Sequence, residues 1–241
     1  MTTALIMGAS GDIGMSICEE LASAGWSLYL HYYQQAEKVI NFASDLQERY
    51  PQQDFFVVSL NMLAENDLAA FFKNLFQVDG IVFAAGFTYY QLLPEMQGQQ
   101  IDNLWQIHVK TPLLILQALQ EKLARSKRGR VIFIGSVYGH RGSSMETVYS
   151  AVKGAQEGFV KAYAKEVATL GITVNVVAPG AVKTAMNQNW QMEELATLTE
   201  EIPLGRLAEP KEIANACSYL FMKEASYITG IILPIAGGWM E

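Results

Sequence analysis

Short apolar runs and amphipathic segments alternate along almost the whole chain, and this alternation limits the folds that it can form. The apolar runs have the length of strands and are apolar at successive positions, which is typical of strands buried on both faces. The segments between them have apolar residues at helical spacing. The expected strands are 3–7, 27–33, 54–60, 80–86, 130–136, 172–180 and 228–234, and the longest expected helices are 36–50, 99–124, 149–170 and 210–222.

Strands that alternate with helices form a parallel sheet, because each return to the same edge of the sheet needs a crossover connection. We therefore expect an α/β fold of the Rossmann type, a doubly wound parallel sheet with helices on both faces. The 241 residues contain no linker, repeat or low-complexity run and match the size of one larger α/β domain. Residues 1–241 are expected to form a single domain.

A glycine-rich loop follows the first expected strand and opens a helix. Glycines in such a loop permit a tight turn and let the backbone approach a pyrophosphate, which then lies against the free N–H groups of the helix. A plain glycine turn is the alternative, but the strand before the loop and the helix after it favour dinucleotide binding. The residues expected to hold the phosphates are Gly8, Ser10, Gly11, Asp12, Ile13 and Gly14.

The second expected strand ends in LHYYQQ (30–35), which contains no acidic residue. Sites specific for NAD usually place an acid there to bind the adenosine ribose 2′-OH. His31, Tyr32, Gln34 and Gln35 surround the expected 2′ position, and no Lys or Arg follows before Lys38. The missing acid favours NADPH over NADH as the cofactor.

The stretch YSAVK (149–153) places a phenol and an ammonium four positions apart, on one face of an expected helix. The Lys153 ammonium is expected to lower the pKa of Tyr149 towards the range of a general acid. A solvated helix face produces the same spacing by chance. Ser136 favours catalysis, because it ends a strand where open α/β sheets bind ligands and its hydroxyl can hold a substrate oxygen. The three residues predict proton donation to a carbonyl while a hydride reaches its carbon.

These motifs, in this order, resemble the short-chain dehydrogenase/reductase family over nearly the whole chain. The matching pieces are the 8–14 loop, the AAG strand end at 84–86, Ser136, the YSAVK stretch and PGAVKT at 179–184. The resemblance implies that Tyr149 donates the proton, Ser136 orients the carbonyl, and Lys153 binds the nicotinamide ribose and tunes Tyr149. It also implies cofactor contacts from Asn61, Ala85, Gly86, Tyr149, Lys153, Pro179, Gly180, Val182 and Thr184.

The sequence departs from the family pattern at several positions. Met7 replaces the usual Thr before the glycine loop, and Asp12 occupies the usual middle Gly position. His108 stands where the family commonly has an Asn that supports a proton-relay water near the catalytic Lys. An imidazole can hold a water too, so His108 is a candidate catalytic residue. A structural His bonded to the backbone is the other interpretation.

The family does not fix the substrate. Segments such as VNVVAPGAVKTAM and EIPLGRLAEPKEIA resemble reductases that act on a 5-aminopentanone group on a lysine of elongation factor P. We expect this ketone as the substrate. The alternatives are a 3-oxoacyl-[acyl-carrier-protein] reductase, a small-molecule ketoreductase, and a non-catalytic NADPH-binding sensor or scaffold, which typically loses Tyr149 or Lys153. Basic residues between 122 and 130 are either a docking patch for a partner protein or a solvated helix end.

Charge and composition exclude several other classes. Seventeen basic and 24 acidic residues give a net charge of −7, which disfavours nucleic acid as a partner. No leader peptide or membrane span is expected, so the predicted location is cytoplasmic. Cys18 and Cys217 lie in apolar helical patterns, without the spacing of a metal site, and are expected to be buried thiols. The family resemblance implies a homotetramer, assembled through 228–240 and the helices 99–124 and 149–170.

Overall fold

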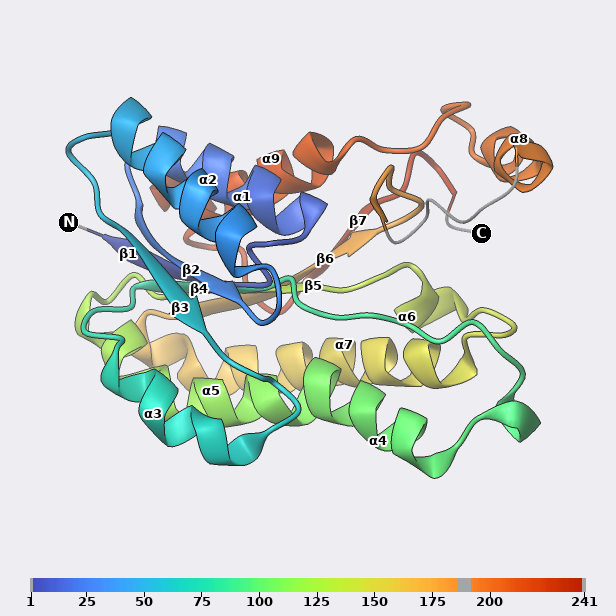
Figure 1. Cartoon of the computed structure of the whole chain (residues 1–241), viewed down its shortest axis with the longest axis horizontal. Coiled ribbons are helices and arrows are strands. Elements are labelled where there is room, and N and C mark those ends of the chain that lie inside the picture. The colour runs from blue at the N-terminus through green and yellow to red at the C-terminus, as the bar shows by residue number, and fades with distance from the viewer. Residues whose placement is uncertain (1, 186–191, 240–241) are drawn as a thin grey trace.

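The computed structural model describes residues 2–185 and 192–239 of the chain. In this part, seven parallel strands form one sheet in the order β3-β2-β1-β4-β5-β6-β7, with helices above and below it (Figure 1). The predicted Rossmann-type fold is confirmed, whereas the single domain stays a prediction. The strands are β1 (Thr3–Met7), β2 (Ser27–Tyr32), β3 (Phe55–Ser59), β4 (Gly80–Phe83), β5 (Arg130–Ile134), β6 (Thr173–Pro179) and β7 (Ile232–Ile235).

The helices divide between the two faces of the sheet. Figure 1 shows α1, α2 and α9 on one face and α3, α4, α5 and α7 on the other. The other two helices, α6 and α8, lie towards the end of the molecule where the chain leaves β5 and β6. The bounds are α1 (Asp12–Ser23), α2 (Ala36–Arg49), α3 (Leu68–Lys73), α4 (Gly98–Trp105), α5 (Thr111–Arg125), α6 (Tyr138–Arg141), α7 (Thr147–Val167), α8 (Met192–Glu201) and α9 (Pro210–Phe221).

The central strand β1 shows why its residues are apolar at successive positions. Leu5 and Met7 belong to the core under α5 and α7, whereas Ala4 and Ile6 belong to the core under α1 and α9. All four side chains are fully buried. Each large one stabilises the fold by about 1.5–3 kcal/mol. A strand with only one apolar face would leave one of the two helix layers without a partner.

Two of the expected elements differ in the structure. The expected helix 99–124 is divided into α4 and α5 by a π-helical segment, Gln106–Lys110. The last strand begins at Ile232 rather than at 228, and Gly230, just before it, has a φ of +74°, outside the β region. The segment between β6 and α9 contains α8, and residues 186–191 of this segment lie outside the described residues.

The order of the strands reverses at β1, which lies between β2 and β4. Ligands of open α/β sheets bind in the crevice at such a point, outside the carboxyl ends of the strands. The loops after β1, β4, β5 and β6 all leave the sheet at this edge.

Cys18 and Cys217 are buried, as predicted. Within residues 2–185 and 192–239, no helix has the length and apolar character that a bilayer crossing requires.

Candidate active site

The loop between β1 and α1 brings backbone close to backbone at two of its glycines. Gly8 has a φ of +88°, and a Cβ there would lie 2.6 Å from Ala85 N. A Cβ on Gly14 would lie 2.1 Å from Gly8 O, so both positions exclude a larger residue. No side chain caps the start of α1 at Gly11, which leaves its first N–H groups available to a pyrophosphate. The loop therefore fits the phosphates of a dinucleotide.

His31, expected beside the ribose 2′ position, is held behind the glycine loop instead. The side chain is 3% exposed. Gly8 N–H donates to Nδ1 at 2.9 Å, and Nε2–H donates to Leu60 O at 3.0 Å. Because one ring nitrogen accepts and the other donates, the imidazole is neutral, and burial lowers its pKa to about 4. Both nitrogens are in use, so the ring has no polar atom left for a ribose hydroxyl, and a cofactor contact of His31 stays a prediction.

Two side chains tie the glycine loop to other segments. Lys38, in the first turn of α2, donates from Nζ to Ser10 O at 2.8 Å. A cation therefore lies at the edge of the loop. The Asp12 Oδ2 atom accepts the Ala185 N–H at 2.7 Å, which joins the start of α1 to the segment after β6. Sequence reasoning missed both contacts, because each joins residues that no local spacing relates.

Ser136, Tyr149 and Lys153 meet at the carboxyl end of β5. Tyr149 and Lys153 lie on one face of α7, and the Lys153 ammonium is 5.3 Å from the centre of the phenol ring. The Lys153 Nζ atom donates to Ile134 O at 2.7 Å. The Ser136 hydroxyl hydrogen-bonds the phenol and lowers its pKa. The structure thus brings the three predicted residues together, and their catalytic roles stay predictions.

The expected lowering of the Tyr149 pKa is not what this geometry produces. Burial raises the pKa of the phenol above its ordinary value, and the nearby Glu146 carboxylate raises it further. Burial also lowers the pKa of Lys153 to about 7, so near neutral pH the Lys153 amine is only partly protonated. Removal of water from the buried phenol decides the direction of this shift, which the helical spacing alone does not reveal.

His108 lies in the π-helical segment and packs edge-on against Tyr149, with ring centres 5.4 Å apart. Its Nε2–H donates to Phe87 O at 2.8 Å, as the structural interpretation expected. Its Nδ1 atom is buried and has no hydrogen-bond partner among the described residues, which leaves an acceptor free. Burial and the charge of Lys153 lower the pKa of His108 to about 3, so the ring is neutral. A catalytic role of His108 stays a prediction.

The other residues expected to contact the cofactor lie along the same edge of the sheet. Asn61 follows β3, and its Oδ1 atom accepts the Leu63 N–H at 3.0 Å. Gly86 follows β4 and packs so closely on His108 that a Cβ would lie 2.2 Å from the ring. Of the remaining predicted contacts, Pro179 ends β6, and Gly180, Val182 and Thr184 lie in the segment after it.

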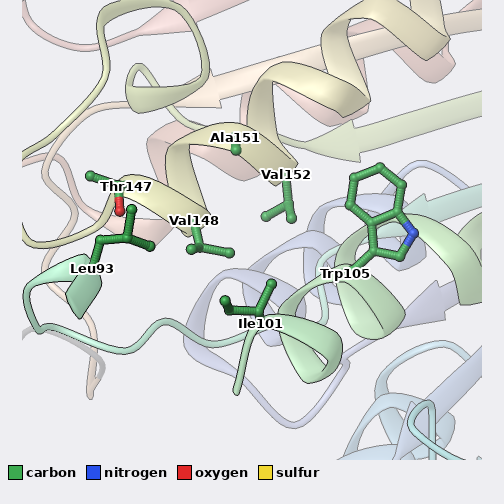
Figure 2. A pocket seen from close by; sticks show the side chains of 7 residues that line it. All are labelled: Leu93, Ile101, Trp105, Thr147, Val148, Ala151 and Val152. Atoms are coloured by element: carbon green, nitrogen blue, oxygen red, sulfur yellow. The ribbon is translucent and has the colours of Figure 1, made fainter. Parts of the chain in front are cut away.

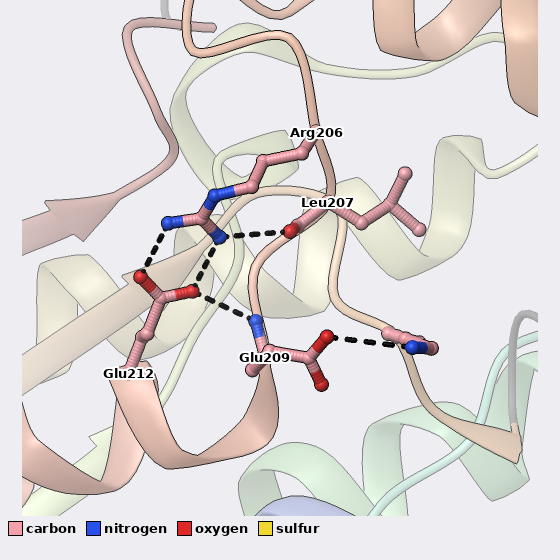
Figure 3. Close-up of polar contacts among 5 residues, drawn as sticks. Arg206, Leu207, Glu209 and Glu212 are labelled. Carbon is pink, nitrogen blue, oxygen red and sulfur yellow. Dashed lines mark hydrogen bonds and ion pairs between the residues drawn. The ribbon is translucent and has the colours of Figure 1, made fainter.

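The segment after β6 is fixed to the start of α9. Lys183 N–H donates to Ala208 O, and Ala208 N–H donates to Ala181 O, both at 2.9 Å. Figure 3 shows the side chains on both sides of Ala208, where Arg206 forms two parallel hydrogen bonds of 2.7 Å with Glu212. The pairing lowers the pKa of Glu212 to about 2. These contacts hold the two ends of the segment between β6 and α9 in place beside the site.

An apolar cavity of about 340 Å³ lies between α7 and α4. Figure 2 shows Val148, Ala151 and Val152 of α7 facing Ile101 and Trp105 of α4. Trp105 is 50% exposed and Ile101 38% exposed. An exposed apolar face of this kind suits contact with another protein surface. The homotetramer expected from the family resemblance stays a prediction, and its predicted segment includes Met240, outside the described residues.

A family model described as enoyl-(acyl carrier protein) reductase matches residues 8–240. Together with the fold and the curated relatives, this match defines the class. The chain belongs to the short-chain dehydrogenase/reductase family and is an NAD(P)-dependent oxidoreductase. It is similar to YmfI, an uncharacterized oxidoreductase of Bacillus subtilis (strain 168), with 39% identity over 241 residues, 98% of this chain and 98% of YmfI.

Further relatives have named activities. The chain is 34% identical over 244 residues to the 3-oxoacyl-[acyl-carrier-protein] reductase FabG of Escherichia coli (strain K12), across 98% of this chain and 96% of FabG. Among solved structures, the angucycline C-6 ketoreductase LanV with bound NADP has a TM-score of 0.92 and 27% identity. That superposition covers 99% of this chain and 95% of LanV. These relatives thus include a 3-oxoacyl-[acyl-carrier-protein] reductase and a ketoreductase with bound NADP.

Proposed function

We propose that the protein is an NADPH-dependent carbonyl reductase that converts a ketone to an alcohol at Tyr149. The observation that carries this proposal is the meeting of Ser136, Tyr149 and Lys153 at the sheet edge that also holds the glycine loop. The nicotinamide cofactor supplies the hydride. The Ser136 hydroxyl holds the substrate oxygen, and the Tyr149 O–H donates its proton to that oxygen as charge develops there. The raised pKa of Tyr149 keeps the phenol protonated and ready to donate.

Lys153 lies beside the proton donor, Tyr149, and supports its role. Its side chain is 5% exposed, and its hydrogen bond to Ile134 O fixes the ammonium beside the phenol ring. With a pKa of about 7, Lys153 can gain and lose a proton near neutrality, which suits a group that restores the proton of Tyr149. His108, with its free Nδ1 acceptor, is placed to hold a water in the same proton path.

NADPH is proposed over NADH for two reasons. The end of β2 offers Tyr32, Tyr33, Gln34 and Gln35 but no carboxylate to bind a ribose 2′-OH or repel a 2′-phosphate. The Lys38 ammonium reaches the glycine loop at Ser10 O, where a cation can turn to a phosphate. The solved structure of LanV, a relative, contains bound NADP.

For the substrate, we propose the 5-aminopentanone group on a lysine of elongation factor P. The support is the resemblance of the C-terminal motifs to reductases of that group. These motifs begin in β6 and end in α9, at the two ends of the segment that is fixed beside the site. The second candidate is a 3-oxoacyl group on acyl carrier protein, favoured by the 34% identity to FabG. A small-molecule ketone is a third, favoured by the likeness to LanV.

The basic residues between 122 and 130 were expected as a docking patch for a partner protein. Their positions in the single chain do not support docking of any of these partners. Arg130 is 4% exposed and donates to Gly129 O and Met222 O, so it belongs to the interior. Lys122 bonds Leu75 O. The exposed members lie at the amino end of β5, which has 5 residues and separates them by about 17 Å from the site at its carboxyl end.

The deciding experiment compares NADPH oxidation with elongation factor P bearing the 5-aminopentanone group, acetoacetyl carrier protein and acetoacetyl-CoA, with the modified lysine followed by mass spectrometry. We expect turnover of the elongation factor, little turnover of the free thioester, and a loss of about a thousandfold or more in Tyr149→Phe. Efficient reduction of the carrier-protein substrate with an unchanged elongation factor would establish the second candidate. Full activity of Tyr149→Phe would refute the proposed proton donor.

A further inference from the structure

The π-helical segment beside the proton donor contains a backbone carbonyl that lacks its regular helical donor. In an α-helix the carbonyl of residue 108 accepts the N–H of residue 112. Residue 112 is Pro112, which has no N–H. Both His108 and Pro112 are buried, away from water that could bond the carbonyl. The His108 O atom is therefore open to a donor from another part of the protein.

Gln156 of α7 supplies this donor. Its Nε2 atom donates to His108 O at 2.7 Å, in a buried contact between residues 48 positions apart. Because a carbonyl can only accept, the amide nitrogen of Gln156 must face His108. The Gln156 Oε1 atom is buried and has no hydrogen-bond partner in the described part of the chain. A buried amide with one unpaired atom is costly, so packing alone does not explain a glutamine at this position.

Gln156 belongs to the same face of α7 as two of the predicted catalytic residues. Tyr149, Lys153 and Gln156 follow one another at intervals of four and three positions, the spacing that brings side chains together on a helix. About 10 Å of helix separates Tyr149 from Gln156. The face of α7 that carries the proton donor therefore also holds the π-helical segment.

The π-helical segment places the His108 ring beside Tyr149. The two rings meet edge-on, with centres 5.4 Å apart, and the imidazole Nε2–H donates to Phe87 O at 2.8 Å. On another side the ring packs on Gly86, where a Cβ would lie 2.2 Å from it. Since the ring is enclosed on these sides, the point at which its backbone is held decides where its Nδ1 atom lies. Segments of π-helix are frequent at functional sites.

We propose that Gln156 is a positioning residue, which holds the His108 carbonyl and thereby keeps the His108 ring against Tyr149 with its Nδ1 acceptor free. Without this hydrogen bond, the carbonyl is free to turn, and the ring turns with it. The inference rests on the proposed ketone reduction at Tyr149 and adds to that site a residue that acts through His108 rather than on the substrate.

The first test follows the His108 ring directly. Gln156→Met keeps the length of the side chain and removes its donor. The chain has three histidines, so NMR spectra of protein labelled with ¹³C and ¹⁵N at histidine are simple, and His108→Ala identifies the signals of His108. In the wild type we expect the proton on Nε2 near neutral pH. In Gln156→Met we expect the chemical shifts of both ring nitrogens of His108 to change.

The second test measures NADPH oxidation with the most reactive of the ketone substrates compared above. The kcat of Gln156→Met is expected to fall about tenfold, with the KM for NADPH within about twofold, because the cofactor loop is unchanged. In a His108→Ala background, the same substitution is expected to change kcat by less than about twofold, because Gln156 acts through His108. A merely structural role would multiply the two losses.

Gln120→Met is the matched control. The Gln120 Oε1 atom accepts the Tyr163 O–H at 2.9 Å, so this substitution also removes a hydrogen bond of a helical glutamine. Tyr163 lies 163 − 149 = 14 positions after Tyr149, about 21 Å further along α7. Gln120→Met is expected to leave both the His108 signals and kcat unchanged.

The outcomes separate this proposal from the proposed function. Unchanged nitrogen shifts in Gln156→Met, or multiplied losses in the double variant, overturn the role of Gln156, while reduction that depends on Tyr149 leaves the reductase standing. If no ketone is reduced, the reductase proposal is overturned, and the nitrogen shifts still decide whether Gln156 holds His108. Gln156→Leu, with the same expectations, replaces a Gln156→Met protein that does not fold. A wild-type His108 with its proton on Nδ1 overturns the proposal without any variant.

Discussion

Acid should destabilise this protein through His31 well before its carboxylates are protonated. In the folded chain, burial lowers the pKa of His31 to about 4 from its ordinary 6.5, because the ring is enclosed and accepts the Gly8 N–H. The unfolded chain binds the proton near pH 6.5, and the folded chain does not do so until about pH 4. Between these values the unfolded state holds more protons, so stability is full above pH 6.5 and is lost as the pH falls.

The size of the effect follows from the two pKa values. A pH of 5 lies about 1.5 units below the pKa of the unfolded imidazole, while the folded ring is still mostly neutral at this pH. The difference corresponds to a loss of about 2 kcal/mol in the free energy of unfolding. At pH 7 the same contribution is close to zero. His31→Gln keeps an amide donor and acceptor but does not titrate. The variant is expected to be less stable at pH 7 by about 1–3 kcal/mol, because one amide cannot serve both Gly8 and Leu60 as the ring does.

The assay is urea unfolding followed by tryptophan fluorescence at pH 7, 6 and 5, at one fixed protein concentration. Between pH 7 and pH 5, His31→Gln should lose about 2 kcal/mol less than the wild type. His108 contributes its own acid-dependent loss to both proteins, and that loss cancels in the comparison. His140→Gln, at an exposed site, is the control and should follow the wild type. Equal losses in His31→Gln and the wild type would show that the imidazole is not held neutral, and would refute the reasoning.

Two further predictions concern the cofactor loop. Lys38→Ala should raise the KM for NADPH roughly tenfold and leave the KM for NADH within about twofold, because only the phosphate gives the ammonium a charged partner; equal changes in steady-state titrations of both cofactors would contradict this. Gly14→Ala should prevent formation of the loop, since its Cβ would lie 2.1 Å from Gly8 O. Thermal unfolding of Gly98→Ala, which has nothing within 4 Å of the added atom, is its control, and a Gly14→Ala protein as stable as this control would show that the loop tolerates the methyl group.

The fold could be predicted because the pattern of apolar residues reports directly on burial. In β1 every side chain enters one of two cores, so the strand is apolar throughout, and this pattern is specific to a covered parallel sheet. The π-helical segment at 106–110 could not be predicted in this way. One additional residue per turn changes the direction of a helical face, but His108 and Val109 are both buried there, so the apolar spacing hardly changes.

The site was predictable where it depends on local spacing. Tyr149 and Lys153 are neighbours because they share a helix, and any helix at that position would bring them together. The role of His31 depends on atoms of Gly8 and Leu60, which belong to loops after two other strands, and sequence spacing contains no information on them. The predicted lowering of the Tyr149 pKa was wrong for a related reason, because the whole surrounding structure determines how far water is removed from the phenol.

The position of β1 at the centre of the sheet has a consequence for the order in which the protein is made. β1 pairs with β2 through Thr3 and Ser27, 27 − 3 = 24 residues apart, and with β4 through Ala4 and Gly80, 80 − 4 = 76 residues apart. The strand that is synthesised first therefore keeps one edge unpaired until β4 has been added, and such distant pairing slows folding. Gly8 packs against Ala85, so the phosphate loop takes its final shape only at that stage. Cofactor can stabilise the finished sheet, but the first steps of folding must proceed without it.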